Sequence, residues 1–253
     1  MTNRGRVRVE AGAKRVRAML GGEVIADTIS PLLVWEVPYF PTYYFPPGDV
    51  RADLLIPTGE TKASPSRGEA TQYVVKAGNA EGAAYAFHDS MIPECVDHYV
   101  FVWNTMDHWF EEDEEVFVHA RDPYTRLDIL PSSRRVRVEI DGVTVADSTN
   151  ASFLFETGLP SRYYFPKTDV RMDLLTATDQ ATGCPYKGTA RYWSVTVDNE
   201  THENVVWGYD SPFPESQKIA GLVAFYNEKT DIYLDQVFQE RPKTKFSQPS
   251  RAT

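Results

Sequence analysis

Cysteine is scarce in this chain of 253 residues, which contains only Cys95 and Cys184. The two lie far apart in unrelated contexts, so a framework of disulfide bonds is excluded as the source of stability. The sequence also lacks an apolar run of the roughly 18 residues that a membrane-spanning helix needs. The segment from Met1 to Arg17 alternates arginine with valine and has no apolar core of the kind found in signal peptides. We therefore expect a cytoplasmic protein that has no membrane partner.

Positive charge is also in short supply. The chain has 26 Lys plus Arg against 36 Asp plus Glu, which gives a net charge of −10. Such a balance repels phosphate backbones, so nucleic acid is not an expected partner. Hydrophobic residues make up 42% of the chain and charged residues 25%, which is typical of a globular protein and excludes a disordered one. Aromatic residues are abundant at 13%, and they favour a strand-rich fold.

The chain contains an internal duplication. The motif Tyr-Tyr-Phe-Pro at residues 43–46 recurs at residues 163–166, an offset of 120 residues (163 − 43). The same offset aligns residues 6–75 with residues 126–195 without a gap. A repeat of about 120 residues has the size of a domain. The sequence therefore predicts two homologous domains in one chain.

The duplication also sets the expected domain boundaries. We place the first copy at residues 1–122, the second at residues 123–241, and a disordered tail at residues 242–253, which are polar and include proline. Two copies of one domain behave as a covalent pseudo-dimer, so we expect a pseudo-two-fold relation between them.

Strand patterns dominate each copy. In the second copy, residues 135–140 alternate polar with apolar side chains, and Asp141-Gly142 then supplies a hairpin turn. Short helical pieces are expected only at residues 170–174 and 215–220, so a parallel sheet with crossover helices is excluded. Each copy is predicted to be mainly β, as a small β-barrel or coiled β-sandwich. The strands expected in the second copy are residues 135–140, 143–146, 152–156, 162–165, 191–197 and 232–234.

These motifs, together with Cys-Pro-Tyr-Lys-Gly at residues 184–188 and Tyr-Trp-Ser at residues 192–194, resemble those of the domain-of-unknown-function 427 family. The arrangement is similar to the tandem, two-copy form found in actinobacteria. The resemblance implies a compact, mainly β domain whose activity is not established. The family has also been labelled a nucleotidyltransferase, but the sequence has neither a glycine-rich phosphate loop nor the acidic pair that Mg²⁺-dependent phosphoryl transfer needs.

Carboxylates recur at matching positions of the two copies. Asp169 and Asp173 are four residues apart, as are Asp49 and Asp53. One interpretation is that the first member caps a helix and the second pairs with a nearby arginine such as Arg171. The alternative is that the second carboxylate and the arginine face a ligand. Arg51 is the corresponding arginine of the first copy.

Two further features could carry chemistry. Glu36 and Glu156 lie in otherwise apolar strands, where a buried carboxylate needs a partner, so each is a candidate for a buried Glu–Arg pair or a site carboxylate. Cys184 precedes Lys187 by three residues, and nearby positive charge favours a reactive thiolate. The alternative for this stretch is a proline-containing turn before a long strand.

Histidine is concentrated in the first copy, which has His88, His98, His108 and His119, whereas the second has only His202. Three of the four adjoin an aspartate, and imidazole with carboxylate suits Zn²⁺ or iron, but the spacing matches no metal motif. Surface or capping roles are the simpler interpretation. No cofactor is expected.

The leading hypothesis is a binding module for a small molecule, with an aromatic and polar pocket. An enzyme that uses Cys184 or a His/Asp metal site of the first copy is one alternative, and a structural or protein-interaction domain is another. No catalytic residue is assigned. The candidate ligand-binding residues are Glu156, Arg162, Tyr164, Arg171, Asp173, Cys184, Lys187 and Trp193 in the second copy, with Glu36, Tyr44, Arg51 and Asp53 in the first.

Overall fold

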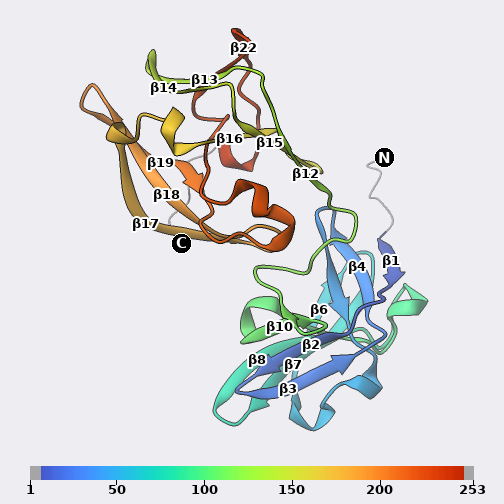
Figure 1. Cartoon of the computed structure of the whole chain (residues 1–253). Helices are drawn as coiled ribbons and strands as arrows, with labels where there is room; N and C mark the ends of the chain where they lie inside the picture. The colour runs from blue at the N-terminus through green and yellow to red at the C-terminus, as the bar shows by residue number, and fades with distance from the viewer. Residues whose placement is uncertain (1–6, 248–253) are drawn as a thin grey trace. The chain divides into compact units, whose positions relative to one another are not determined.

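The computed structural model describes residues 7–247, and the chain divides into two compact units, Met1–Pro123 and Tyr124–Thr253. This division falls one residue from the boundary expected from the repeat. Both units consist of β-strands and short 3₁₀ turns (Figure 1), so the prediction of a mainly β fold is confirmed. No helix among the described residues is long and apolar enough to cross a membrane.

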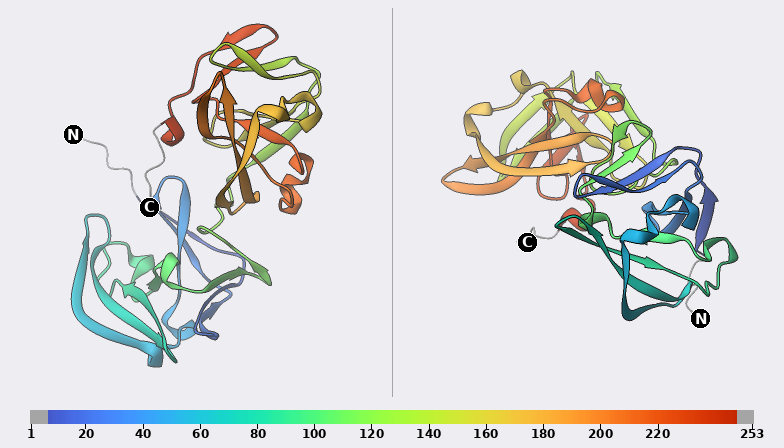
Figure 2. Two further views of the ribbon diagram at one scale, coloured as in Figure 1. Left: turned by 90° about the vertical axis from the view of Figure 1, so that its left-hand side faces the viewer. Right: turned by 90° about the horizontal axis from the view of Figure 1, so that it is seen from below.

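The second unit contains two antiparallel sheets. The larger has seven strands in the order β12-β15-β16-β20-β19-β18-β17, and the smaller has four in the order β14-β13-β21-β22. The long strands β17, β18 and β19 lie side by side in every view (Figures 1 and 2). The strands of this unit are β12 (Leu127–Pro131), β13 (Val136–Ile140), β14 (Val143–Ser148), β15 (Ser152–Glu156), β16 (Arg162–Phe165), β17 (Leu175–Cys184), β18 (Gly188–Val197), β19 (Glu200–Gly208), β20 (Val223–Phe225), β21 (Asp231–Leu234) and β22 (Val237–Gln239), and the 3₁₀ turns are η5 (Lys167–Asp169), η6 (Met172–Leu174), η7 (Pro214–Ile219) and η8 (Lys245–Ser247).

The first unit repeats this arrangement. Its sheets are β1-β4-β5, β6-β7-β8-β9 and β11-β10-β2-β3, and an isolated bridge between Phe45 and Tyr99 joins the first two into the counterpart of the seven-stranded sheet. The strands are β1 (Arg8–Ala11), β2 (Val16–Leu20), β3 (Glu23–Thr28), β4 (Leu32–Val37), β5 (Phe40–Tyr44), β6 (Leu55–Ser64), β7 (Gly68–Ala77), β8 (Ala80–Ala86), β9 (Tyr99–Phe101), β10 (His108–Glu111) and β11 (Glu114–Glu115), and the 3₁₀ turns are η1 (Pro47–Asp49), η2 (Ala52–Leu54), η3 (Pro93–Cys95) and η4 (Trp103–Thr105).

Each unit has two apolar clusters, because successive side chains of a strand point to opposite faces. In β16, Tyr163 and Phe165 face the main core, which the strands of both sheets share, whereas Tyr164 belongs to a separate cluster. We call the separate one the secondary cluster. In the second copy it consists of Ile129, Leu154, Tyr164, Ala190, Tyr192, Trp207, Tyr209, Ile219 and Ala224, and in the first copy of Val34, Tyr44, Ala70, Tyr85, Phe87, Cys95 and Val100.

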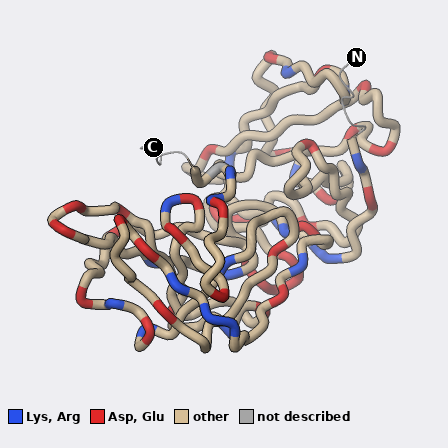
Figure 3. Tube along the Cα trace, turned by 90° about the horizontal axis from the view of Figure 1, so that it is seen from above, with Lys and Arg blue, Asp and Glu red and all other residues tan. Residues whose placement is uncertain are grey.

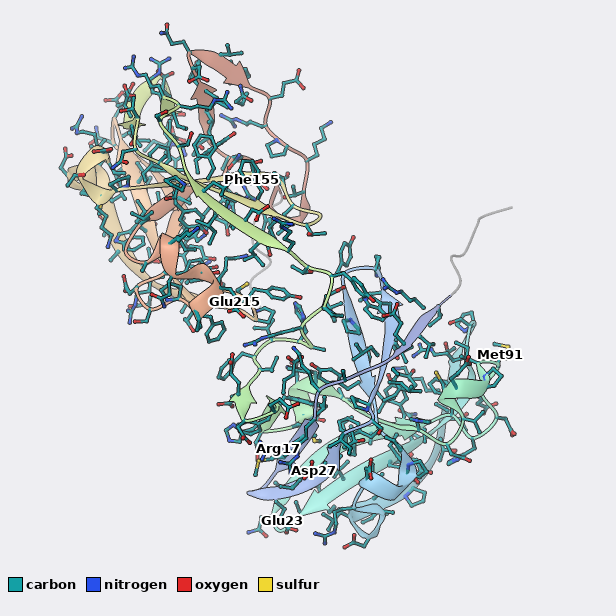
Figure 4. The ribbon with its side chains drawn as sticks, turned by 45° about the vertical axis from the view of Figure 1, so that its right-hand side comes forward. Arg17, Glu23, Asp27, Met91, Phe155 and Glu215 are labelled. Atoms are coloured by element: carbon teal, nitrogen blue, oxygen red, sulfur yellow. The ribbon has the colours of Figure 1, made fainter. Side chains whose placement is uncertain are left out.

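Charged residues are interspersed along the traces of both units (Figure 3). Some of them form ion pairs between neighbouring segments. Asp27 on β3 is opposite Arg17 of β2 in the strand register (Figure 4), but it accepts a hydrogen bond from Nε of Arg15, at 2.7 Å. The second copy repeats the latter contact, with Arg135 Nε 2.8 Å from Asp147. Such exposed ion pairs contribute about 0–1 kcal/mol each to the stability of the fold, so they are not its main source of stability.

The short helical piece expected at residues 215–220 is present as the 3₁₀ helix η7. Two other local predictions need correction. Within residues 170–174 only Met172–Leu174 form a 3₁₀ turn, η6, and Asp169 does not cap it; Asp169 accepts a hydrogen bond from Ser148 Oγ at 2.6 Å. The predicted tail is ordered as far as Ser247, because Thr244 donates to Glu228 at 2.6 Å and the ring of Phe246 packs 5.8 Å from that of Tyr226. Residues 248–253 lie outside the described part.

Candidate functional site

The second copy buries an ion pair beside its secondary cluster. Glu156 ends β15 and points to the same sheet face as Leu154, since the two positions differ by two. Lys187 lies in the turn that joins β17 to β18, where the sequence predicted a proline-containing turn before a long strand. Its ammonium lies 2.5 Å from Glu156 Oε2, and the two side chains are only 8% and 10% exposed. The turn therefore places its positive charge against an acid of the sheet.

The first copy has an ion pair at the same place. Glu36 Oε1 accepts hydrogen bonds from Arg67, from the hydroxyl of Tyr44 at 2.8 Å and from that of Tyr85 at 3.2 Å. Arg67 also donates to the Tyr44 oxygen at 2.7 Å and lies 5.0 Å from the centre of the Phe87 ring. Of the two alternatives for Glu36, the Glu–Arg pair is present, with the Arg67 and Glu36 side chains 13% and 20% exposed. In the second copy lysine replaces arginine at the offset of 120.

Aromatic hydroxyls and an indole complete the site of the second copy. Trp207 Nε1 donates to the Tyr164 oxygen at 3.1 Å, and the two rings meet edge to face at 6.2 Å. Burial raises the pKa of Tyr164 and of Tyr209 well above the ordinary value, and the nearby Glu156 carboxylate raises both further. Both phenols therefore stay protonated and remain hydrogen-bond donors.

Arg162 also contacts the Trp207 ring, but its charge is paired elsewhere. It makes a two-pronged ion pair with Glu228, at 2.7 Å for each N–H···O distance, and the two side chains are 7% and 0% exposed. Its guanidinium carbon lies 5.5 Å from the Trp207 ring and 5.8 Å from that of Phe246. Arg162 is thus fully engaged within the protein.

Trp193, Arg171 and Asp173 are not brought to this site, whereas Cys184 lies near Tyr164 and Tyr209. Trp193 packs against the main core under Lys167, whose ammonium is 5.2 Å from the ring, so it faces away from Tyr164. Arg171 and Asp173 pair with each other at 2.6 Å, with side chains 55% and 60% exposed. The predicted pairing of Asp173 with a nearby arginine is confirmed, and Arg51 with Asp53 repeats it in the first copy at 2.7 Å.

The two cysteines differ in access. Cys184 is partly exposed at the end of β17, and the ammonium of Lys187 three residues later is paired with Glu156. Cys95 is fully buried, and burial raises the pKa of its thiol to about 11.

We expect iodoacetamide at about pH 8 to modify Cys184 in the folded protein and to leave Cys95 unmodified, because only the accessible thiolate reacts. Peptide mass spectrometry measures this. In denaturant both thiols should react. Equal labelling of the two in the folded protein would contradict the burial of Cys95.

The histidines of the first copy do not gather. His88 pairs with Asp97 at 2.8 Å, and His108 pairs with Glu115 at 2.6 Å. Within residues 7–247, three potential metal ligands converge only in the second copy, at Asp141, Glu200 and His202. The metal site considered for the first copy is therefore not formed.

Sequence reasoning missed several partners. Arg67 was available as the counterpart of Lys187 by the repeat offset, and a basic residue at both positions was the signal for a shared ion pair. Asn227 and Glu228, which accept hydrogen bonds from Arg162, carry no such signal because they follow the aligned region.

A protein-family model described as a domain of unknown function (DUF427) matches the chain twice, over residues 8–112 and residues 128–236. No curated protein is similar enough to the chain to count as a match. Each matched segment lies within one of the two units, and together the segments cover most of the chain. The chain therefore belongs to the DUF427 family and carries two segments of that domain.

Proposed function

We propose that each copy is a binding module for a small molecule, held between the buried ion pair and the aromatic side chains of the secondary cluster. One observation carries the proposal: both copies bury an acid–base pair at corresponding positions beside tyrosine, although the base differs. A buried ion pair is often no more stable than an apolar replacement. The fold alone therefore gives little reason to keep one in each copy.

The chemistry of the site suggests the class of ligand. Glu156 and Lys187 together have no net charge, so a ligand with a net charge would leave one buried charge uncompensated. Tyr164 and Tyr209 carry protonated hydroxyls, and the Trp207 indole lies edge to face with Tyr164. A neutral or zwitterionic molecule with an apolar ring suits this combination.

The test compares small molecules that co-purify with the full chain and with two variants, Glu156→Gln and Lys187→Met. We expect a molecule that is present in the unaltered protein, detected by native mass spectrometry, and lost from both variants. The matched control is Asp173→Asn, which breaks an exposed ion pair of the same copy and should retain the molecule.

Identical molecules in all four proteins, or none in any, would count against the proposal. In that case the ion pairs have a structural role, and the two variants should differ from the unaltered protein in stability alone.

A further inference from the structure

Three side chains with metal-ligand chemistry converge at one corner of the second copy, away from the proposed ligand site. Asp141 lies in the turn between β13 and β14, whereas Glu200 and His202 are alternate residues of β19 and so share a face of the sheet. One potential ligand atom from each residue lies within 4.8 Å of the others. His202 Nε2 is 2.6 Å from Asp141 Oδ2.

The first copy shows that the fold does not need side chains at this corner. Gly21 matches Asp141 at the offset of 120. Ala80 matches Glu200 and Gly82 matches His202, because each pair of residues has corresponding register partners on the neighbouring strand of its copy. All three matching residues lack a donor side chain. Among the described residues of the first copy, the only carboxylate with a hydrogen bond to these three positions is Asp107, which accepts from the Gly21 N–H at 2.6 Å, whereas the second copy brings three ligand-type residues together.

Packing in the first copy explains the difference. A Cβ atom on Gly82 would lie 2.3 Å from Met106 Cε and 2.9 Å from the Thr105 carbonyl oxygen, and one on Gly21 would lie 2.5 Å from the Ala77 oxygen. In the first copy, neighbouring atoms therefore occupy the space that side chains at Gly21 and Gly82 would need. In the second copy the same corner holds an imidazole and two carboxylates, and the Asp141 side chain is half exposed.

We propose that Asp141, Glu200 and His202 bind one divalent transition-metal cation of the zinc class. One imidazole nitrogen with two carboxylate oxygens suits Zn²⁺ and its neighbours, whereas Ca²⁺ and Mg²⁺ prefer oxygen ligands alone. The cation takes the place of the proton that joins His202 Nε2 to Asp141 Oδ2, and that proton moves to Nδ1 or to solvent. Three protein ligands on an exposed corner leave a coordination position for water.

The test uses the full chain, freed of metal with a chelator, and Zn²⁺ alone as the probe. Calorimetry and elemental analysis should give one zinc per chain, and millimolar Mg²⁺ should not displace it. We expect Asp141→Asn, Glu200→Gln and His202→Ala each to weaken binding by roughly tenfold or more, since even residues behind the ligands of a metal site are worth about 10- to 100-fold. Replacing Zn²⁺ with Co²⁺ should give a visible absorption band that is lost in the same variants.

The matched control is His88→Ala, which removes the imidazole of a two-residue His–Asp pair in the first copy and should leave zinc binding unchanged. Asp141→Asn and Glu200→Gln keep the size of the side chain, so loss of binding in them does not follow from misfolding. Equal binding in these two variants and the unaltered protein, or the same loss in His88→Ala, would overturn the proposal.

Discussion

Replacing Arg162 with methionine is expected to lower the stability of the second unit by about 3–5 kcal/mol, the usual cost of leaving a buried charge without its partner. The Glu228 side chain is fully buried, and Arg162 supplies two of its hydrogen bonds. Without the guanidinium, the carboxylate keeps the Thr244 hydroxyl and a backbone N–H as donors but loses the positive charge beside it. Denaturant unfolding followed by hydrogen exchange of amides in the second unit measures the loss.

The matched control is Arg171→Met, which breaks an exposed pair with Asp173. It should cost about 1 kcal/mol or less, because water replaces the lost partner. Similar losses in the two variants would contradict the assignment of Arg162 and Glu228 as a buried pair.

The pair also predicts a dependence on pH. Burial acts to raise the pKa of the Glu228 carboxyl, but hydrogen bonds from Arg162 and Thr244 outweigh it and hold that pKa below its ordinary value. A folded pKa below the unfolded one stabilises the protein above the unfolded value, and this contribution is lost as the pH falls through the folded value. Stability should therefore decline as the pH falls below the ordinary pKa of a glutamate, and Arg162→Met should remove this part of the decline.

Replacing Phe165 with alanine is expected to lower the stability of the second unit by about 3–5 kcal/mol, because it leaves a cavity in the main core. Phe165 is fully buried, and its ring meets that of Phe225 edge to face at 5.8 Å. The corresponding change Phe45→Ala should act in the same way on the first unit, where Phe45 meets Phe101 at 5.5 Å. Denaturant unfolding of each variant gives the values.

Phe155→Ala serves as the control for this prediction. Its ring is 42% exposed at the surface of the second unit (Figure 4), so its removal should cost about 1 kcal/mol or less. If Phe155→Ala lowered the stability as much as Phe165→Ala, the prediction that the buried ring contributes more to stability than the exposed one would be wrong.

The sequence was informative where a strand has one clear pattern. Residues 135–140 alternate, and β13 follows them to within a residue. β17 escaped prediction because its side chains are mostly exposed and give no hydrophobic period; it forms by pairing with β18, which no local pattern can show. Tertiary pairing decides such strands.

The site was predictable to a similar extent. Glu156 stood out as an acid among apolar residues, and the structure gives it a partner from a turn 31 positions away. The choice of Trp193 as a neighbour of Tyr164 failed for a geometric reason. Each face of this sheet carries an apolar cluster, so alternation separates the faces without saying which one carries the site. Trp207, on the adjacent strand, is the residue that faces Tyr164.

The strand that carries Tyr-Tyr-Phe is buried on both of its faces in each copy, as Tyr163, Tyr164 and Phe165 are in the second. Such a segment has no side chain free to change without disturbing one cluster or the other, so selection for packing alone would preserve it. The Tyr-Tyr-Phe motif, by which this chain resembles its family, therefore indicates the fold and not the function. Differences in chemistry between the copies are better sought where they disagree, as at Arg67 and Lys187 or at Gly82 and His202.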